Sequence, residues 1–123
     1  MGTWGEGNFE NDGALDFVGG LIDELVEKIN ECFADEDLAA LDEDGEAVIV
    51  PGVHVISVLN EQCHAAPPKL DIIIGWRDKY LAIFDEQIGG LDPVKGFEQK
   101  RRAIIEATFS KLEEQSRRFW GES

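Results

Sequence analysis

Three carboxylates near the start of the chain have the side-chain type and spacing for metal chemistry. Glu10 precedes Asp12 and Asp16, which are four residues apart and therefore share one face of a helical turn. Oxygen ligands in such an arrangement can hold a hard divalent cation, as a metal-dependent hydrolase would require. However, Asn11 and Asp12 are also typical helix caps, and acids in a first turn suit the helix dipole. We expect the capping role, and the hydrolase remains an alternative.

A second acidic run, Asp42-Glu43-Asp44, is followed by Gly45 and is similar in composition to a calcium-binding loop. If Gly45 takes the sixth position of that loop, Ala40 and Pro51 fall at the first and twelfth positions. Neither side chain can be a ligand. The run is therefore expected to be a solvated acidic loop.

The cysteines and histidines do not have the spacing of a zinc site or a nucleophilic pair. Zinc sites use short paired spacings such as Cys-x-x-Cys, whereas Cys32 and His54 stand alone and Cys63 is adjacent to His64. Neighbours on a helix point about 100° apart, so Cys63 and His64 cannot act on one atom. We expect no catalytic residue, no metal and no cofactor, and we expect both cysteines to be reduced.

Charge is divided unequally along the chain, which has 123 residues and a net charge of −15. Residues 1–66 contain 16 acids and one base, whereas residues 67–123 contain 10 of each, so the whole excess lies in the first half. Nucleic acids and anionic membranes require clustered Lys and Arg, and this distribution argues against both. It favours a basic protein partner, and the alternative is an acidic surface that serves solubility.

Length and composition predict one domain, 1–123, with a single core. The hydrophobic share is 43%, and no apolar run approaches the roughly 18 residues of a membrane helix. The amino-terminal residues lack the basic region of a signal peptide, so a cytoplasmic location is the default.

Helical spacing dominates the first half. After the cap at Asn11 or Asp12, apolar side chains recur with a helical period: Leu15, Val18, Ile22, Leu25, Val26, Ile29 and Phe33. Gly19-Gly20 either weakens this helix or allows another helix to approach closely. Residues 35–46 read as a loop with one short helical turn. Residues 47–59 fit both strand and helix, and we favour a helix that begins near Pro51.

Two further helices are expected in the second half. Residues 70–88 have a clear amphipathic pattern that ends at Gly89-Gly90. Asp92-Pro93 combines a cap with a first-turn proline and predicts the start of the last helix, which runs to about Trp120. One face of this helix is expected to contain Val94, Phe97, Ile104, Thr108, Leu112 and Phe119. The chain is therefore predicted to be a compact all-α bundle of four or five helices.

The amino-terminal motif carries a family resemblance. Met1-Gly2-Thr3-Trp4-Gly5 is followed by Phe9-Glu10-Asn11-Asp12 and then by Ala14-Leu15-Asp16. With these motifs the chain resembles a bacterial domain of unknown function, family 4259. The resemblance implies an all-helical fold and implies no activity. Relatives tend to have an alanine-rich helix where this chain has Val50-Pro51-Gly52-Val53, which predicts a kinked or late helix there.

The function predicted from these features is protein binding without catalysis. A bacterial immunity protein against a basic toxin would have this charge pattern, and a structural homo-oligomer is a further alternative; the oligomeric state is left open. Trp4 and Phe9 are costly to leave in water, so their segment is expected to pack on the helices. The candidate binding residues are Trp4, Glu10, Asn11, Asp12, Asp16, Asp35, Glu36, Asp37, Asp42, Glu43 and Asp44.

Overall fold

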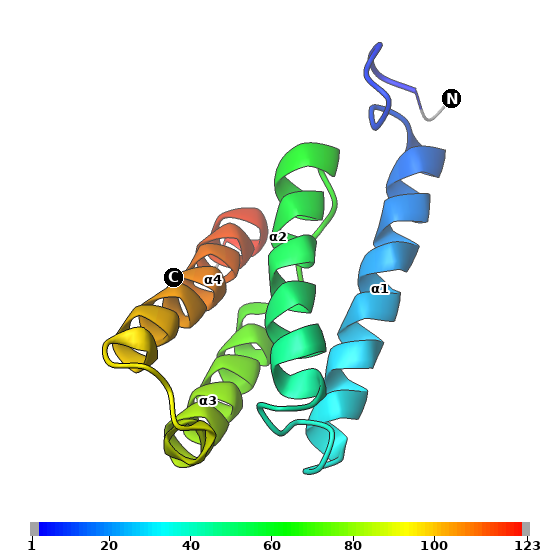
Figure 1. The fold of residues 1–123 in the computed structure, drawn as a ribbon. Coiled ribbons are helices and arrows are strands. Elements are labelled where there is room, and N and C mark those ends of the chain that lie inside the picture. Colours follow the sequence, from blue (N-terminus) through cyan, green and yellow to red (C-terminus); the bar gives the residue numbers. More distant parts are fainter. Residues whose placement is uncertain (1–2, 122–123) are drawn as a thin grey trace.

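A computed structural model describes residues 3–121 and has the predicted all-α fold. Within this range the α-helices are α1 (Asp12–Ala34), α2 (Val50–Cys63), α3 (Leu70–Gln87) and α4 (Phe97–Trp120). A π-helical turn, η1 (Gly45–Ile49), leads into α2, and a 3₁₀ turn, η2 (Ile88–Leu91), follows α3. α2 contacts α1 on one side and α4 on the other, and α3 packs against α4 (Figure 1).

The start of α1 confirms the predicted capping role of Asn11. Its backbone is extended, and its side-chain oxygen accepts a hydrogen bond of 2.7 Å from the backbone N–H of Ala14. Asp12 is the first helical residue and is exposed. A side chain at Gly19 or Gly20 would meet no atom within 4 Å, so close helix approach does not explain this pair.

The ambiguous middle segment is helical, as favoured. η1 and α2 run continuously from Gly45 to Cys63, with Pro51 in the first turn of α2, where its missing N–H costs nothing. Before them, the Asp35 carboxylate accepts hydrogen bonds from the backbone N–H groups of Asp37 and Leu38. This local turn begins the acidic loop of residues 35–44.

The predicted start of α4 at Asp92-Pro93 is wrong. Asp92 has a φ of +51°, whereas a capping residue needs extended backbone, and α4 begins only at Phe97. The residue before it is Gly96, whose φ of +86° is a conformation that glycine adopts without strain.

Of the side chains predicted to share one face of the last helix, only Leu112 is buried. Ile104 and Ile105 are neighbours on the helix, and the sequence pattern does not decide which of them points inward. The structure buries Ile105, whereas Ile104 is exposed. The buried side chains of α4 are Ile105, Phe109, Leu112, Glu113, Gln115 and Ser116.

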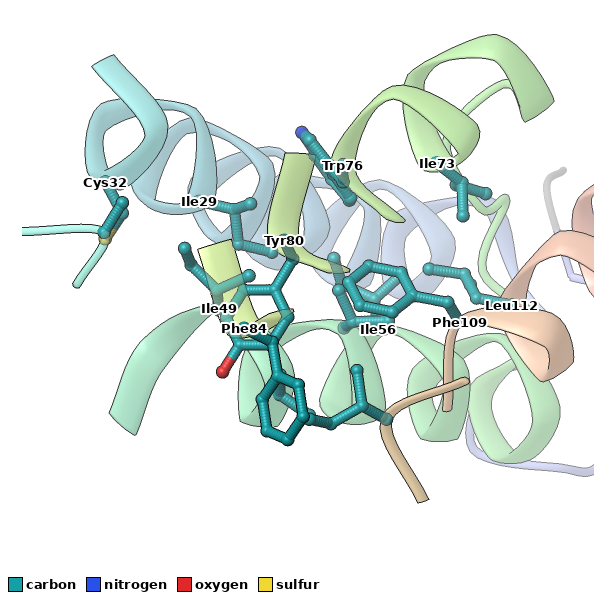
Figure 2. Packing of buried hydrophobic residues seen from close by; sticks show 14 of the residues in the cluster. Ile29, Cys32, Ile49, Ile56, Ile73, Trp76, Tyr80, Phe84, Phe109 and Leu112 are labelled. Carbon is teal, nitrogen blue, oxygen red and sulfur yellow. The ribbon is translucent and has the colours of Figure 1, made fainter. Parts of the chain in front are cut away.

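The core lies among all four helices (Figure 2). At its centre the rings of Tyr80 and Phe109 are 6.2 Å apart, and both side chains are fully buried. Burial raises the pKa of Tyr80 to about 12. Trp76 of α3 is buried as well, and its indole N–H donates a hydrogen bond of 2.8 Å to the Asn30 side chain on α1. The core therefore joins α3 to both α1 and α4.

The last turn of α4 is fastened to the linker between α2 and α3. The Trp120 indole N–H donates to the carbonyl of Pro67 at 2.9 Å, and the Ser116 hydroxyl donates to that of Pro68 at 2.7 Å. The Lys69 ammonium lies 3.7 Å from the centre of the Trp120 ring, within cation–π range. We call these contacts the Trp120 clasp.

Candidate functional site

The amino-terminal motif folds back on itself, and Trp4 does not pack on the helices. Trp4 is 56% exposed, which contradicts the prediction, whereas Phe9 is half-buried against the core as expected. The backbone N–H of Trp4 donates to the carbonyl of Glu10 at 3.0 Å, and the Glu10 carboxylate accepts from the N–H of Gly7 at 3.2 Å. A Cβ at Gly5 would lie 1.5 Å from that carboxylate, so any other residue there would displace the Glu10 side chain.

This segment lies beyond the first turn of α1 (Figure 1). An isolated antiparallel bridge joins Thr3 to Asn11 and closes the turn. Met1 and Gly2, the first residues of the predicted packed segment, lie outside the described residues. The exposed Trp4 ring is consequently available to a partner and contributes little to the core.

The structure does not bring together Glu10, Asp12 and Asp16, the carboxylates of the alternative metal-dependent hydrolase. Glu10 is directed at the Gly7 N–H, while Asp12 and Asp16 are exposed on α1. Across residues 3–121, no group of three or more His, Cys, Asp or Glu side chains converges to hold a metal ion. The geometry therefore gives the hydrolase alternative no support.

The two cysteines are free thiols in helices, as expected. Cys32 is buried in α1, and Cys63 is the last residue of α2. Burial, followed by the charge of Asp44, raises the pKa of the Cys32 thiol and disfavours a reactive thiolate.

The predicted binding residues form two groups at opposite ends of α1. Trp4, Glu10, Asn11, Asp12 and Asp16 lie at its start, and the acidic loop follows its last residue. A helix of 23 residues separates them by about 33 Å. Of the loop acids, Asp35, Glu36, Asp37, Asp42 and Glu43 are exposed and Asp44 is half-buried.

The acids along α1 connect these two groups. α1 contains six carboxylates and one base, Lys28, and all seven side chains are exposed on the side away from the core. The six are Asp12, Asp16, Asp23, Glu24, Glu27 and Glu31. We call them the α1 acidic face. Of these six acids, only Asp12 and Asp16 are among the binding residues predicted from the sequence.

Among the described residues, the carboxylates of the α1 acidic face take part in no ion pair. In the described part of the chain, the pairs are made by second-half bases: Arg77, Arg101, Arg102, Lys111, Arg117 and Arg118. Between residues 3 and 66, Glu46 and Glu61 are the acids that take part. The hydrogen bond from Lys111 lowers the pKa of Glu61, whereas no carboxylate of α1 has an ionic partner in this range.

An apolar groove runs between α1 and α2, beside the α1 acidic face. Its lining residues are Leu21, Glu24, Leu25 and Lys28 of α1 with Val55 and Leu59 of α2, and its volume is about 410 Å³. Leu21 and Val55 are 36% and 45% exposed, and Phe17, one turn before Leu21, is 67% exposed. The sequence pattern does not indicate this groove, because Leu21 and Phe17 lie outside the apolar helical stripe that predicts the core side of α1.

The fold and these surfaces define a small all-α bundle protein with acidic and apolar side chains exposed together along one helix. The model of the family described as Domain of unknown function (DUF4259) matches residues 2–123, so the chain belongs to this family, as the amino-terminal motif indicated. Comparison with curated proteins and with solved structures gave no match. Among the described residues, no helix has the length and apolar character needed to cross a membrane.

Proposed function

We propose that this protein is a non-enzymatic binding module for a basic protein, which it contacts through the α1 acidic face. The observation that carries the proposal is the absence of ionic partners for six exposed carboxylates within residues 3–121. Like charges at i,i+4 destabilise a helix, so Asp23, Glu27 and Glu31 are a cost to the isolated protein. A basic partner would relieve this repulsion, and the relief would add to the free energy of binding.

The acidic loop extends this surface at the end of α1. Asp35, Glu36 and Asp37, and Asp42 and Glu43 after them, add exposed negative charge close to Glu31. A field of one sign raises the rate at which an oppositely charged protein arrives. A basic toxin held by an immunity-type protein in the bacterial cytoplasm is the kind of partner that such steering suits.

The test compares two charge reversals of equal size. One variant carries Asp23→Lys, Glu27→Lys and Glu31→Lys on α1. The control carries Asp71→Lys, Glu86→Lys and Glu98→Lys, three exposed acids without ion pairs among the described residues. Both variants and the wild type are used as bait in a bacterial lysate at low and high salt, and captured proteins are identified by mass spectrometry.

We expect the wild type and the control to retain a basic protein at low salt and to lose it at high salt, because exposed charges are screened beyond about 10 Å at 0.1 M. The α1 variant should not retain it. Equal loss with both variants would show that net charge alone matters, and capture of nucleic acid by the wild type would contradict the proposal. With the captured protein in hand, reversal of Asp35, Glu36 and Asp37 should slow association more than it speeds dissociation.

A further inference from the structure

The groove between α1 and α2 leaves apolar side chains in water beside the α1 acidic face. Leu21 and Val55 form its walls and Leu25 and Leu59 contribute to its lining, while Phe17 is exposed one turn further along α1. Contiguous exposed apolar side chains with a charged rim are typical of protein interaction sites. The groove therefore offers an anchoring point that charge alone does not provide.

The shape of the groove suits a helix. α1 and α2 run in opposite directions side by side (Figure 1), and the groove between two such helices accepts the side-chain ridge of a third. From Leu21 to Lys28 the α1 wall extends for about two helical turns. An amphipathic helix buries side chains at i, i+3, i+4 and i+7 in a groove of this kind.

The charge of the rim determines the chemistry of that helix. Glu24 and Lys28 both line the groove, while Asp16, Glu27 and Glu31 are among the other exposed acids of α1, which has no base besides Lys28. A docked helix with Lys or Arg beside its apolar ridge would pair with these acids.

A second copy of this chain does not supply such a helix. Its α1 would bring acids against acids, and among the described residues every base of α4 except Lys100 already forms an ion pair. Arg101, Arg102 and Arg118 already form ion pairs with Glu46, with Asp85 and Glu106, and with Glu114.

We propose that the α1–α2 groove docks a basic amphipathic helix of the partner, with its apolar side chains between Leu21 and Val55 and its Lys or Arg side chains along the α1 acidic face. This inference rests on the proposed function, since it names the segment by which the basic partner binds. It adds that binding requires the groove as well as the charge.

The test uses a fluorescent helical peptide of leucines and lysines, with leucine at the i, i+3, i+4 and i+7 positions, and measures its binding by fluorescence anisotropy. A matched peptide has glutamate in place of every lysine. The proteins are the wild type, Leu21→Gln and Val55→Gln in the groove, and Ile72→Gln as a control, since Ile72 is similarly exposed on α3. Circular dichroism and thermal unfolding show whether each variant folds.

We expect the lysine peptide to bind the wild type and Ile72→Gln equally, and both groove variants about tenfold more weakly, the usual loss for an anchoring side chain. The glutamate peptide should not bind. If the groove variants bind like the wild type but reversal of Asp23, Glu27 and Glu31 abolishes binding, the groove inference fails and the proposed function stands. If none of these changes affects binding, or the lysine peptide does not bind the wild type, the groove inference fails outright.

Self-association provides a separate check. Sedimentation velocity of the wild type should show a monomer whose mass is unchanged by Val55→Gln. A wild-type dimer that Val55→Gln dissociates would assign the groove to a second copy and overturn the inference.

Discussion

α1 and α4 are helices of nearly equal length, 23 and 24 residues, but they use their charges in opposite ways. Charged side chains of α4 form ion pairs with α2, α3, η1 or α4 itself, and its Glu113 is only 3% exposed beside Arg77. The carboxylates of α1 are all exposed, and within residues 3–121 none has an ionic partner. The charges of α4 therefore hold the fold together, whereas those of α1 do not.

The largest expected effect on the free energy of unfolding is at the buried ion pair between Arg77 and Glu113. Arg77→Ala removes the guanidinium that lies 2.7 Å from the Glu113 carboxylate and leaves that carboxylate with Arg117 at 3.9 Å. A buried charge that loses its partner destabilises a protein strongly, and we expect a loss of roughly 3 kcal/mol in the free energy of unfolding. Urea denaturation measures it.

The control for that experiment is Lys111→Ala, which breaks an ion pair in which both side chains are about half exposed. We expect a loss of less than about 1 kcal/mol. Combining Arg77→Met with Glu113→Leu should recover most of the stability lost in Arg77→Ala. A small effect of Arg77→Ala would mean that α4 uses its charges no differently from α1.

A medium effect is expected at the start of α1. Asn11→Ala removes the acceptor for the Ala14 N–H and should lower the free energy of unfolding by about 1 kcal/mol. Asp12→Asn, at the neighbouring exposed position, should change it by no more than a few tenths of a kcal/mol, since only a dipole interaction is lost. Thermal unfolding of the two variants measures both effects. A larger loss of stability for Asp12→Asn than for Asn11→Ala would assign the cap to Asp12.

A smaller effect, of opposite sign, is expected on the α1 acidic face. Asp23→Asn, Glu27→Gln and Glu31→Gln together remove two like-charge i,i+4 pairs and should raise the free energy of unfolding by about 0.5 kcal/mol. Added salt should stabilise the wild type and have less effect on this variant. A decrease in stability would show that these carboxylates have structural partners.

The smallest effect is the acid dependence of the pair between Asp85 and Arg102. The hydrogen bond from Arg102 lowers the pKa of Asp85, so the pair stabilises the protein above the pKa of an unfolded aspartate, about 3.9. That contribution is lost as the pH falls through the lower pKa of the folded state. Both side chains are partly exposed, so Asp85→Asn should reduce the fall in melting temperature on acidification only slightly. An equal fall in melting temperature in the wild type and Asp85→Asn would show that this pair does not contribute to the acid dependence of stability.

Much of the fold could be predicted from the sequence because its signals are local. The cap at Asn11 and the apolar repeats of α1 and α3 depend on residues close together in the chain. The start of α4 could not be predicted, because Asp92-Pro93 is a good cap only when its backbone is extended, and here the chain first turns through left-handed conformations at Asp92 and Gly96. The choice between Ile104 and Ile105 likewise depends on how α2 and α3 meet α4.

The candidate surface could be predicted in its charge but not in its shape. The division of acids and bases between the two halves can be counted in the sequence, and it places the excess negative charge in the first half of the chain, which contains the α1 acidic face. Whether an acid has an ionic partner depends on contacts between distant residues, such as Glu46 with Arg101. The groove also requires two helices, because Leu21 and Val55 become neighbours only when α1 packs against α2.

The Trp120 clasp has a consequence for local motion. Terminal helical turns generally open first, and their amide protons exchange quickly with solvent. In α4 the indole and hydroxyl bonds to Pro67 and Pro68 connect the last turn to a linker more than 45 residues earlier in the chain. Its amides should therefore exchange nearly as slowly as those in the middle of the helix, and Trp120→Phe, which removes the indole donor, should restore fast exchange there.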